Sequence, residues 1–358
     1  MSSDSAIFIC NICGSPCTRP PEGMVRDLRS CEACGSSVRL RALIALLSKE
    51  VFGVPLTLPE FPVLKSVRGI GMSDSPDLAA RLSEKFDYTN TFYHQAPFFD
   101  VTQPDPRDEG RYDFILTSEV MEHVPPPVER SFAALYRMLK PHALLLMTTP
   151  YTLGGKTVEH FPELHEYALA SPGGHIVLVN RRRDGSLETF DNLVFHGGPG
   201  STLEMRVFSE TSLRCLLEQA GFSGVHIATE NSTEFGVEHA ETWSLPIAAR
   251  KGRFEAPSLE LAIAYRNARH LVGNLERQLA ALQGEYERFV SFHNQSHQDE
   301  KQALTERTEW ALNLEREKSE HQASAASLHL QLEEARSAMA ALEQRFWVRL
   351  GRRLGALD

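Results

Sequence analysis

Residues 112–124 decide the fold of this chain, and they read Tyr112-Asp-Phe-Ile-Leu-Thr-Ser-Glu-Val-Met-Glu-His-Val124. The first half is an apolar run with the length of a buried strand, and polar residues follow it. A segment with helical apolar spacing over 128–139 and a second apolar run over 143–148 come next. This order of strand, helix and strand predicts two parallel strands joined by a crossover helix.

The same alternation of short apolar strands with amphipathic helices extends from Val63 to about Arg250. It predicts an α/β fold for residues 51–252, in which a doubly wound, Rossmann-like sheet carries helices on both faces. Gly221 should end the last helix of this domain. The predicted strands are 63–67, 88–93, 112–117, 143–148, 225–229 and 243–248, and the predicted helices are 77–85, 128–139 and 210–220.

Residues 151–206 form a connection much longer than is usual between the elements of such a sheet. Within it, the segments 175–182 and 186–195 flank Arg183-Asp184-Gly185 and predict a β-hairpin. Long insertions beside the carboxyl ends of the strands are where such folds build substrate sites. We therefore expect this insertion to contribute to the substrate site.

Two cysteine pairs with C-x2-C spacing lie near the N-terminus and are separated by seventeen residues. In a chain without a secretion signal this pattern predicts a structural zinc site, with reduced cysteines in a small packed hairpin as the alternative. Gly14 and Gly35 follow the pairs and allow the tight turns of a zinc knuckle. Cys17 could replace one ligand, and Cys215 is expected in the core. The predicted ligands are Cys10, Cys13, Cys31 and Cys34, in a module over residues 1–50 that ends in a docking helix over 38–51.

The composition changes after Pro257, where proline disappears and Ala, Glu, Leu, Gln and Arg dominate. Apolar residues at heptad spacing predict an α-helical coiled coil over 257–346, with a polar break over 293–301. A continuous helix of this length would be on the order of 130 Å long. Because one amphipathic helix cannot bury its apolar seam alone, we expect a homo-oligomer. The basic tail over 347–358 is either a solvated helix end or a peripheral contact with an anionic membrane surface.

Acidic residues outnumber basic ones by 47 to 37, and the formal net charge is −10. Nucleic-acid backbones bind basic surfaces, so this balance argues against a nucleic-acid partner. The start, Met1-Ser2-Ser3-Asp4, is not a basic segment followed by an apolar stretch. No apolar run approaches the ~20 residues of a membrane span. We therefore expect a cytoplasmic protein, peripheral to the inner membrane if its tail binds lipid.

Across residues 63–150 the sequence resembles the class I S-adenosylmethionine-dependent methyltransferases that carry a Glu-His pair after the fourth strand. The resemblance rests on the block 112–124, on Leu135-Tyr-Arg-Met-Leu-Lys-Pro141 and on the strand that ends at Pro150. In that family these segments are a strand, the Glu-His turn, a helix that ends in Leu-Lys-Pro and a fifth strand. The resemblance implies an enzyme that uses S-adenosylmethionine as its cofactor.

The glycine-rich motif of that family has a weaker counterpart in residues 63–71. Two glycines are present, but Lys65 stands in place of an acid and Val67 in place of the first glycine. Asp100 stands where the family places an acid near the adenine amino group, and the end of the fourth strand should line the methionine end. The resemblance thus implies that the cofactor-binding residues are Gly69, Gly71, Asp100, Thr117, Ser118 and Glu119.

Methyl transfer from a sulfonium is an in-line displacement, in which an enzyme mainly aligns the acceptor with the methyl group and excludes water. A hydroxyl acceptor benefits from a general base, and histidine is the common choice near neutral pH. The chain offers one histidine in the Glu-His pair and several in the insertion, although each could instead be structural or solvated. The candidate catalytic residues are His123, His160 and His196.

The order of zinc module, methyltransferase domain and coiled coil is similar to that of bacterial methyltransferases associated with surface polysaccharide or sugar modification. This resemblance implies a hydroxyl of a sugar, glycan or small molecule as the acceptor. The alternative function is a methyltransferase-like scaffold that no longer binds cofactor and recruits partners through the coiled coil. The departures at Lys65 and Val67 favour that alternative.

Overall fold

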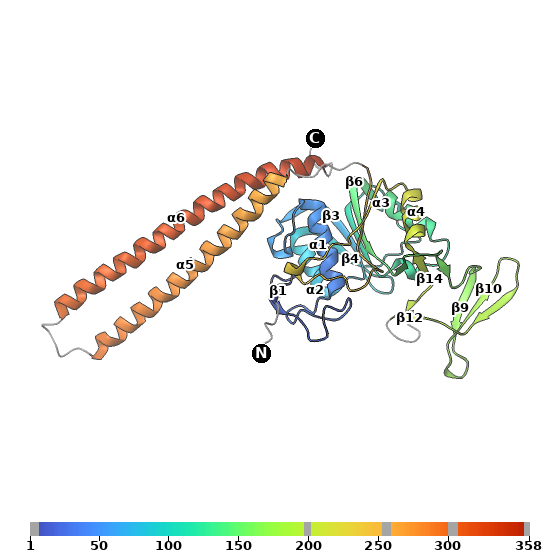
Figure 1. The fold of residues 1–358 in the computed structure, drawn as a ribbon, viewed down its shortest axis with the longest axis horizontal. Coiled ribbons are helices and arrows are strands. Elements are labelled where there is room, and N and C mark those ends of the chain that lie inside the picture. Colours follow the sequence, from blue (N-terminus) through green and yellow to red (C-terminus); the bar gives the residue numbers. More distant parts are fainter. Residues whose placement is uncertain (1–6, 197–201, 253–258, 300–306, 354–358) are drawn as a thin grey trace. The chain divides into compact units, whose positions relative to one another are not determined.

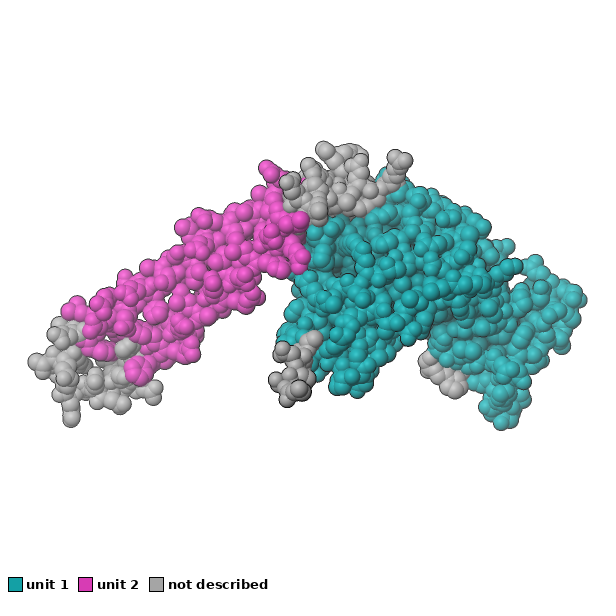
Figure 2. Space-filling model, viewed as in Figure 1, with its two compact units in different colours: residues 1–256, 350–358 teal, residues 257–349 magenta. Residues whose placement is uncertain are grey.

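The computed structural model describes residues 7–196, 202–252, 259–299 and 307–353. The chain divides into two compact units, of which one comprises residues 1–256 with 350–358 and the other residues 257–349 (Figure 2). The first unit holds the central sheet and the cysteine module. The second unit consists of two long helices.

The central sheet of the first unit has six strands in the order β15-β16-β6-β5-β3-β4. All pairs among β3, β4, β5 and β6 are parallel, and β16 alone runs against its two neighbours. The predicted α/β fold with a largely parallel sheet is therefore confirmed. The strands are β3 (Leu64–Met72), β4 (Phe86–Thr91), β5 (Tyr112–Ser118), β6 (Leu139–Thr148), β15 (Gly224–Ile227) and β16 (Ile247–Arg250).

Helices cover both faces of this sheet, with α1 and α2 on one side and α3 and α4 on the other (Figure 1). Phe132 and Leu135 of α3 and Leu213 and Leu217 of α4 are buried in one apolar core with the strands. Gly221 ends α4 in the left-handed conformation at φ 111°, as predicted. The helices are α1 (Val38–Phe52), α2 (Pro76–Lys85), α3 (Glu129–Met138) and α4 (Glu210–Ala220), and the 3₁₀ helices are η1 (Leu58–Glu60), η2 (Pro106–Asp108), η3 (Met121–His123), η4 (Pro172–Gly174) and η5 (Thr233–Phe235).

Strand β3 is longer than the sequence indicated, because it continues to Met72. Gly69 and Gly71, which we expected in a cofactor-binding turn, lie inside this strand. A side chain at Gly69 would overlap the ring of Phe114, and one at Gly71 would overlap Asp74 and Tyr88. These glycines therefore make room for packing within the sheet domain. A second correction concerns Cys215, which is exposed on α4 and not in the core.

The insertion after β6 builds small sheets of its own, and the predicted hairpin is present with Gly185 at φ 88° in its turn. A satellite core of Phe161, Leu178, Leu203 and Met205 lies beneath it. The strands are β7 (Tyr151–Thr152), β8 (Val158–Glu159), β9 (Glu166–Ala170), β10 (Val177–Arg181), β11 (Leu187–Phe190), β12 (Phe195–His196), β13 (Thr202–Leu203) and β14 (Arg206–Ser209). The cysteine module adds a hairpin of β1 (Ile7–Ile9) and β2 (Pro16–Thr18).

The second unit is a helical hairpin of α5 (Leu259–Asp299) and α6 (Arg307–Arg353). Helix α5 continues through 293–299, most of the segment that we predicted as a break, and residues 300–306 lie outside the described part. Arg336 forms an ion pair with Glu276 at 3.0 Å, and the rings of Tyr265 and Phe346 stack at 5.7 Å. The two helices therefore run antiparallel (Figure 1). The apolar seam is buried within one chain, so the seam by itself does not require a second copy. Its buried residues are Val272, Leu275, Leu279, Leu332 and Ala335.

Two further expectations about the C-terminal region need correction. Leu271 and Phe292, two apolar residues of the segment 257–346 in which we predicted a buried coiled-coil seam, are exposed. The tail over 347–358 is not a separate segment from its first residue, because α6 continues to Arg353, and residues 354–358 lie outside the described part. Among the described residues, no helix is long and apolar enough to cross a membrane.

Replacing Gly69 with alanine should destabilise the sheet domain. The new Cβ would lie 2.2 Å from Cζ of Phe114, a side chain that is itself buried. Overpacking of this kind costs about 1–3 kcal/mol. Gly154→Ala is the matched control, because no atom lies within 4 Å of its added Cβ. Pulse proteolysis in urea, with cleavage inside residues 64–250 read by mass spectrometry, measures the stability of both variants. Equal stabilities of the two variants would contradict the packing role.

Candidate functional site

The cysteine module brings the four predicted zinc ligands together. Their four Sγ atoms all lie within 4.8 Å of one another. Gly14 and Gly35 adopt φ of 79° and 67°, and their amides donate to the carbonyl oxygens of Cys10 and Cys31 at 2.7 Å. These are the tight turns that we expected after each pair. Cys17 is buried on β2 and does not belong to the group.

The sulfur geometry fits a tetrahedral zinc ion. The Sγ atoms of Cys10 and Cys34 are 3.7 Å apart, and those of Cys13 and Cys31 are 3.5 Å apart. Zn–S bonds of about 2.3 Å at tetrahedral angles separate two sulfurs by about 3.8 Å. Hydrogen bonds from the Cys34 thiol and the Ser36 hydroxyl lower the pKa of Cys10 to about 4, so its thiolate is the favoured form. A thiolate is the form that binds zinc.

The buried guanidinium of Arg41 anchors the module to the rest of its unit. It donates to the carbonyl oxygens of Ser36, Phe235 and Gly236 at 2.9, 3.0 and 2.9 Å, and to the hydroxyl of Ser30 at 2.8 Å. An arginine that is 0% exposed requires such partners. The cysteine turn and the loop that precedes β16 are therefore held by one side chain.

The carboxyl end of β5 carries three of the predicted cofactor-binding residues. Thr117 is fully buried, and its Oγ1 has no hydrogen-bond partner among the described residues. Ser118 shares a hydrogen bond of 2.8 Å with Thr148 on the neighbouring strand. Glu119 adopts φ 56°, a left-handed conformation that is uncommon for a residue with a side chain. The chain thus turns sharply where the strand ends.

Two arginines from the cysteine module reach this end of β5, which the sequence did not indicate. Arg39 donates to the hydroxyl of Ser118, and Arg26 donates to the carboxylate of Glu119 at 2.7 Å. Asp27 accepts from both guanidinium groups at 2.6 Å. These contacts bring the module against two of the residues that were predicted to bind the cofactor.

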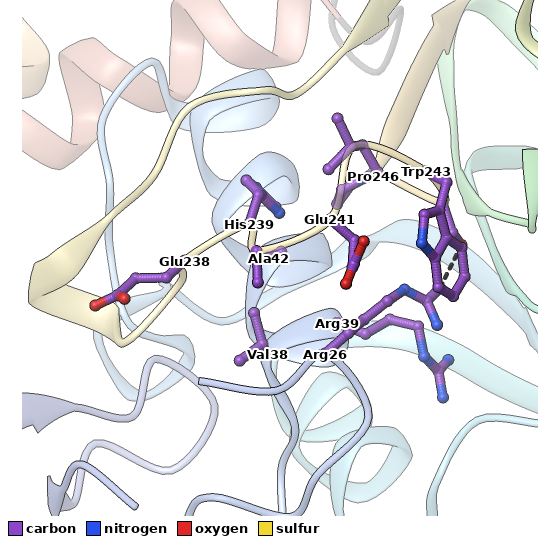
Figure 3. Close-up of a pocket in the computed structure, with 12 residues that line it drawn as sticks. Arg26, Val38, Arg39, Ala42, Glu238, His239, Glu241, Trp243 and Pro246 are labelled. Atoms are coloured by element: carbon purple, nitrogen blue, oxygen red, sulfur yellow. Dashed lines mark hydrogen bonds between the residues drawn. The ribbon is translucent and has the colours of Figure 1, made fainter. Parts of the chain in front are cut away.

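A pocket adjoins these arginines (Figure 3). The guanidinium of Arg26 lies 5.2 Å from the ring centroid of Trp243, and Figure 3 shows the carboxylate of Glu241 nearby. The pocket therefore offers an aromatic face together with groups of both charges. It is lined by residues of the cysteine module, of α1 and of the segment 238–246 that leads to β16.

The turn after β3 contains Ser73 at φ 61° and the buried Asp74. The hydroxyl of Tyr88 donates to the Asp74 carboxylate, and Asn90 bonds the backbone of Asp74 on both sides. Burial raises the pKa of Asp74 to about 7, although the Tyr88 hydrogen bond and the charge of Arg39 act in the opposite direction. This turn follows directly after Gly71 and Met72, at the carboxyl end of β3.

Asp100, the residue proposed for the adenine end, lies in the loop after β4. Its Oδ1 accepts from the amide and the hydroxyl of Thr102 at 2.8 and 2.7 Å. This local turn fixes the position of the carboxylate. No contact in the structure tests the adenine role, which stays a prediction.

The Glu-His turn forms η3 directly after Glu119. His123 Nδ1 lies 2.9 Å from the carbonyl oxygen of Leu203, and because a carbonyl only accepts, Nδ1 carries the proton. Its Nε2 faces Glu122 Oε1 at 3.7 Å. Glu122 is completely buried, and burial followed by the charge of Glu119 raises its pKa to about 8. Burial lowers the pKa of His123, so the neutral ring is favoured.

Glu204 brings the other two candidate histidines to the same place. His160 Nε2 lies 2.8 Å from one carboxylate oxygen of Glu204, and His196 Nε2 lies 3.0 Å from the other. The rings of His123 and His196 are in edge contact, with centroids 4.7 Å apart. All three predicted histidines therefore belong to one cluster, which also contains Glu122 and Glu204.

Arg206 fixes the backbone of the Glu-His turn beside this cluster. It is fully buried, and it donates to the carbonyl oxygens of Met121 and Val124 at 3.2 and 2.6 Å and to Glu159 at 2.6 Å. The sequence analysis missed both Glu204 and Arg206. The available signal was the alternation of charged with apolar residues over 203–207, which places both charges on one face of an extended segment.

Comparison with protein families shows that residues 62–227 match a family described as a methyltransferase domain. The match covers the central sheet through β15 and the whole insertion, but fewer than half of the 358 residues. The domain over residues 62–227 is therefore an S-adenosylmethionine-dependent methyltransferase domain. No curated protein matches the chain.

Several solved structures resemble parts of this chain. One is 1,6-didemethyltoxoflavin-N1-methyltransferase of Burkholderia thailandensis, with 15% identity over 60% of this chain and 78% of that one, at a TM-score of 0.33. Another is an amino pentose methyltransferase of Micromonospora echinaspora, with 11% identity over 61% and 92% and a TM-score of 0.34. A third is the CMeT domain of citrinin polyketide synthase, with 15% identity, 53% of this chain, 47% of that chain and a TM-score of 0.29. This chain thus spans less than half of the third structure.

The stability of the sheet domain should fall as pH rises from about 4 toward 7, and Asp74→Asn should reduce that fall, leaving the part that Glu122 contributes. The folded pKa of about 7 exceeds the unfolded value of about 3.9. Between these values the folded state binds more protons, so the unfolding free energy decreases with rising pH and levels off above pH 7. One pKa unit corresponds to about 1.4 kcal/mol, so the change should be a few kcal/mol.

Urea unfolding by pulse proteolysis at pH 5 and pH 8 measures this effect. The unfolding free energy of Asp74→Asn, relative to that of the natural sequence, should be higher at pH 8 than at pH 5. Asp77→Asn, in the exposed first turn of α2, is the matched control. A natural protein that is equally stable at both pH values would show that Asp74 ionises normally.

Proposed function

We propose that this methyltransferase transfers a methyl group to a hydroxyl of a sugar, glycan or small molecule. The observation that carries the proposal is the Glu204 carboxylate, which orients two histidines beside the turn at the end of β5. A carboxylate that fixes one nitrogen of an imidazole prepares the other nitrogen to take a proton. A hydroxyl acceptor has such a proton to lose.

We assign the base to His160, which makes the shorter contact with Glu204, at 2.8 Å. His123 is less suited, because its Nδ1 donates to Leu203 and its Nε2 faces Glu122. In the proposed reaction the acceptor oxygen gives its proton to His160 as the new C–O bond forms. Glu204 stabilises the imidazolium that results, since it already accepts from Nε2.

The carboxyl edge of β3 and β5 has groups that fit the cofactor. When bound, S-adenosylmethionine supplies the methyl group and departs as the neutral thioether. The Thr117 hydroxyl, which has no hydrogen-bond partner within the described part of the chain, and the left-handed Ser73 turn offer polar groups at this edge. Asp100 is proposed for the adenine end, and Ser118 and Glu119 for the methionine end. The arginines bound to these last two residues would exclude water from that side.

The cysteine module is proposed to hold structural zinc. Four thiolates close every position of a tetrahedral ion, so no site is left for substrate. The role of the ion would be to fix the turn that presents Arg26, Asp27 and Arg39. The order of cysteine module, methyltransferase domain and helical hairpin supports the proposed acceptor class. It also supports a proposed place in bacterial surface polysaccharide biosynthesis.

His160→Gln should lower kcat by about 10²–10⁴-fold, which is the usual contribution of a general base. Isothermal titration with S-adenosylmethionine first establishes cofactor binding, and a screen of nucleotide sugars and glycans then finds the acceptor. Cofactor affinity should be unchanged in the variant, and the acidic limb of the pH–rate profile should disappear. His175→Gln, an exposed histidine of the insertion, is the control. A protein that binds no cofactor with or without acceptors would contradict the proposal.

Removal of zinc should loosen the module and weaken cofactor binding. Metal analysis of Cys13→Ser should show the loss of one zinc ion per chain relative to the natural protein, with faster proteolysis before Val38. Cys17→Ser should keep the ion, because Cys17 lies outside the group of four. Retention of the ion by Cys13→Ser together with its loss from Cys17→Ser would reverse the assignment.

A further inference from the structure

The cluster around the Glu-His turn has the donor atoms of a second metal site, of a different kind from the cysteine site. Glu122, His123 and His196 each offer one ligand atom, and these atoms lie within 4.8 Å of one another. Two donors on one ion with bonds of about 2.1 Å lie at most about 4.2 Å apart. Side-chain shifts of less than an ångström would therefore bring all three onto a common ion.

Glu122 is the first independent sign that a cation belongs here. Its side chain is 0% exposed, and Oε2 accepts a hydrogen bond of 2.9 Å from Thr149. Oε1 has no hydrogen-bond partner among the described residues. A buried carboxylate oxygen without a partner is costly, and a bound cation removes that cost. A proton shared with His123 does not explain the arrangement, because 3.7 Å is too long for a hydrogen bond.

The tautomer of His123 is the second sign. Nδ1 donates its proton to the carbonyl oxygen of Leu203, which leaves a lone pair on Nε2, the nitrogen that faces Glu122. Metal-binding histidines commonly donate their other ring N–H to a backbone carbonyl or a carboxylate, and such contacts fix the ring. His196 has the corresponding contact, between its Nε2 and Glu204 at 3.0 Å. Both histidines thus have the supporting partners of metal ligands.

We propose that Glu122, His123 and His196 bind a divalent transition-metal ion, with Glu204 orienting His196. Imidazole and carboxylate ligands suit manganese, iron or zinc, whereas the four thiolates of the N-terminal module select zinc. The two sites therefore differ in the metals that they accept. Three protein ligands also leave coordination positions open, as in catalytic rather than structural sites.

The role of this ion deepens the proposed function and rests on it, whereas the binding of the ion does not. An ion at the cluster would bind the acceptor hydroxyl as a Lewis acid and lower its pKa. His160, which shares Glu204 with His196, would take the proton that is released. The acceptor would then be held by the metal rather than by a shaped pocket of side chains.

Mn²⁺ binding to the full zinc-loaded chain tests the site directly. The electron paramagnetic resonance signal of free Mn²⁺ should fall until one ion per chain is bound, and Mn²⁺ should raise the melting temperature. Glu122→Gln and His196→Ala should each weaken binding at least tenfold and abolish the thermal shift. His175→Ala should bind like the natural chain, and so should Cys13→Ser if its sheet domain remains folded by circular dichroism.

The outcomes separate the metal site from the proposed function. Absence of Mn²⁺ binding, or equal binding by Glu122→Gln and His196→Ala with folded melting curves, would overturn the site. Full methyl transfer in the presence of a chelator that removes the second ion would overturn its catalytic role and leave the methyltransferase function intact. Mn²⁺ binding that depends on both residues, in a protein that binds no S-adenosylmethionine, would support the site and reject the proposed function.

Discussion

The pairing of β5 between β3 and β6 is the interaction on which the rest of the first unit depends. Six of the seven residues of β5 are buried, and parallel neighbours satisfy its backbone on both sides. The buried Asp113 is neutralised at the start of the strand by Lys140 at 2.8 Å. Polar side chains that contact a ligand can therefore lie only at the carboxyl end of the strand, where the burial ends. For this reason the site begins at Thr117 and continues through the Glu-His turn.

Two distant parts of the sequence complete this edge, and each does so through a buried arginine. Arg41 joins the cysteine module to the loop before β16, which allows Arg26 and Arg39 to contact the end of β5. Arg206 joins the insertion to η3, which allows Glu204 to meet the histidines. The site is therefore assembled by long-range contacts of guanidinium groups with backbone carbonyls. Such contacts are rigid because a buried charge without partners would be strongly destabilising.

Local patterns in the sequence predicted the elements well, because strand burial and helix periodicity act over a few residues. The sequence also indicated the four cysteines and the three histidines that the structure brings together, because these residue types are the common metal ligands and bases, and their roles stay predictions. The close approach of Asp74 and Tyr88 to Gly71 was not predictable, because it depends on residues of the turn and of the neighbouring strand, and the cofactor-binding role of Gly71 stays a prediction. Glu204 was missed because its histidine partners lie 44 and 8 positions away in the sequence. The heptads of the second unit likewise do not reveal whether their partner is another chain or another part of the same one.

The antiparallel hairpin of α5 and α6 has a consequence for how this chain can change in length. Facing residues such as Glu276 and Arg336 have positions whose sum is nearly constant along the hairpin. An insertion in one helix alone would shift every pair on one side of it out of register. Equal insertions in both helices, at the ends next to residues 300–306, would keep the existing pairs in register. Seven residues added to each helix would lengthen the hairpin by about 10 Å. The length of the helical hairpin can therefore change in evolution by matched insertions, without any change to the first unit.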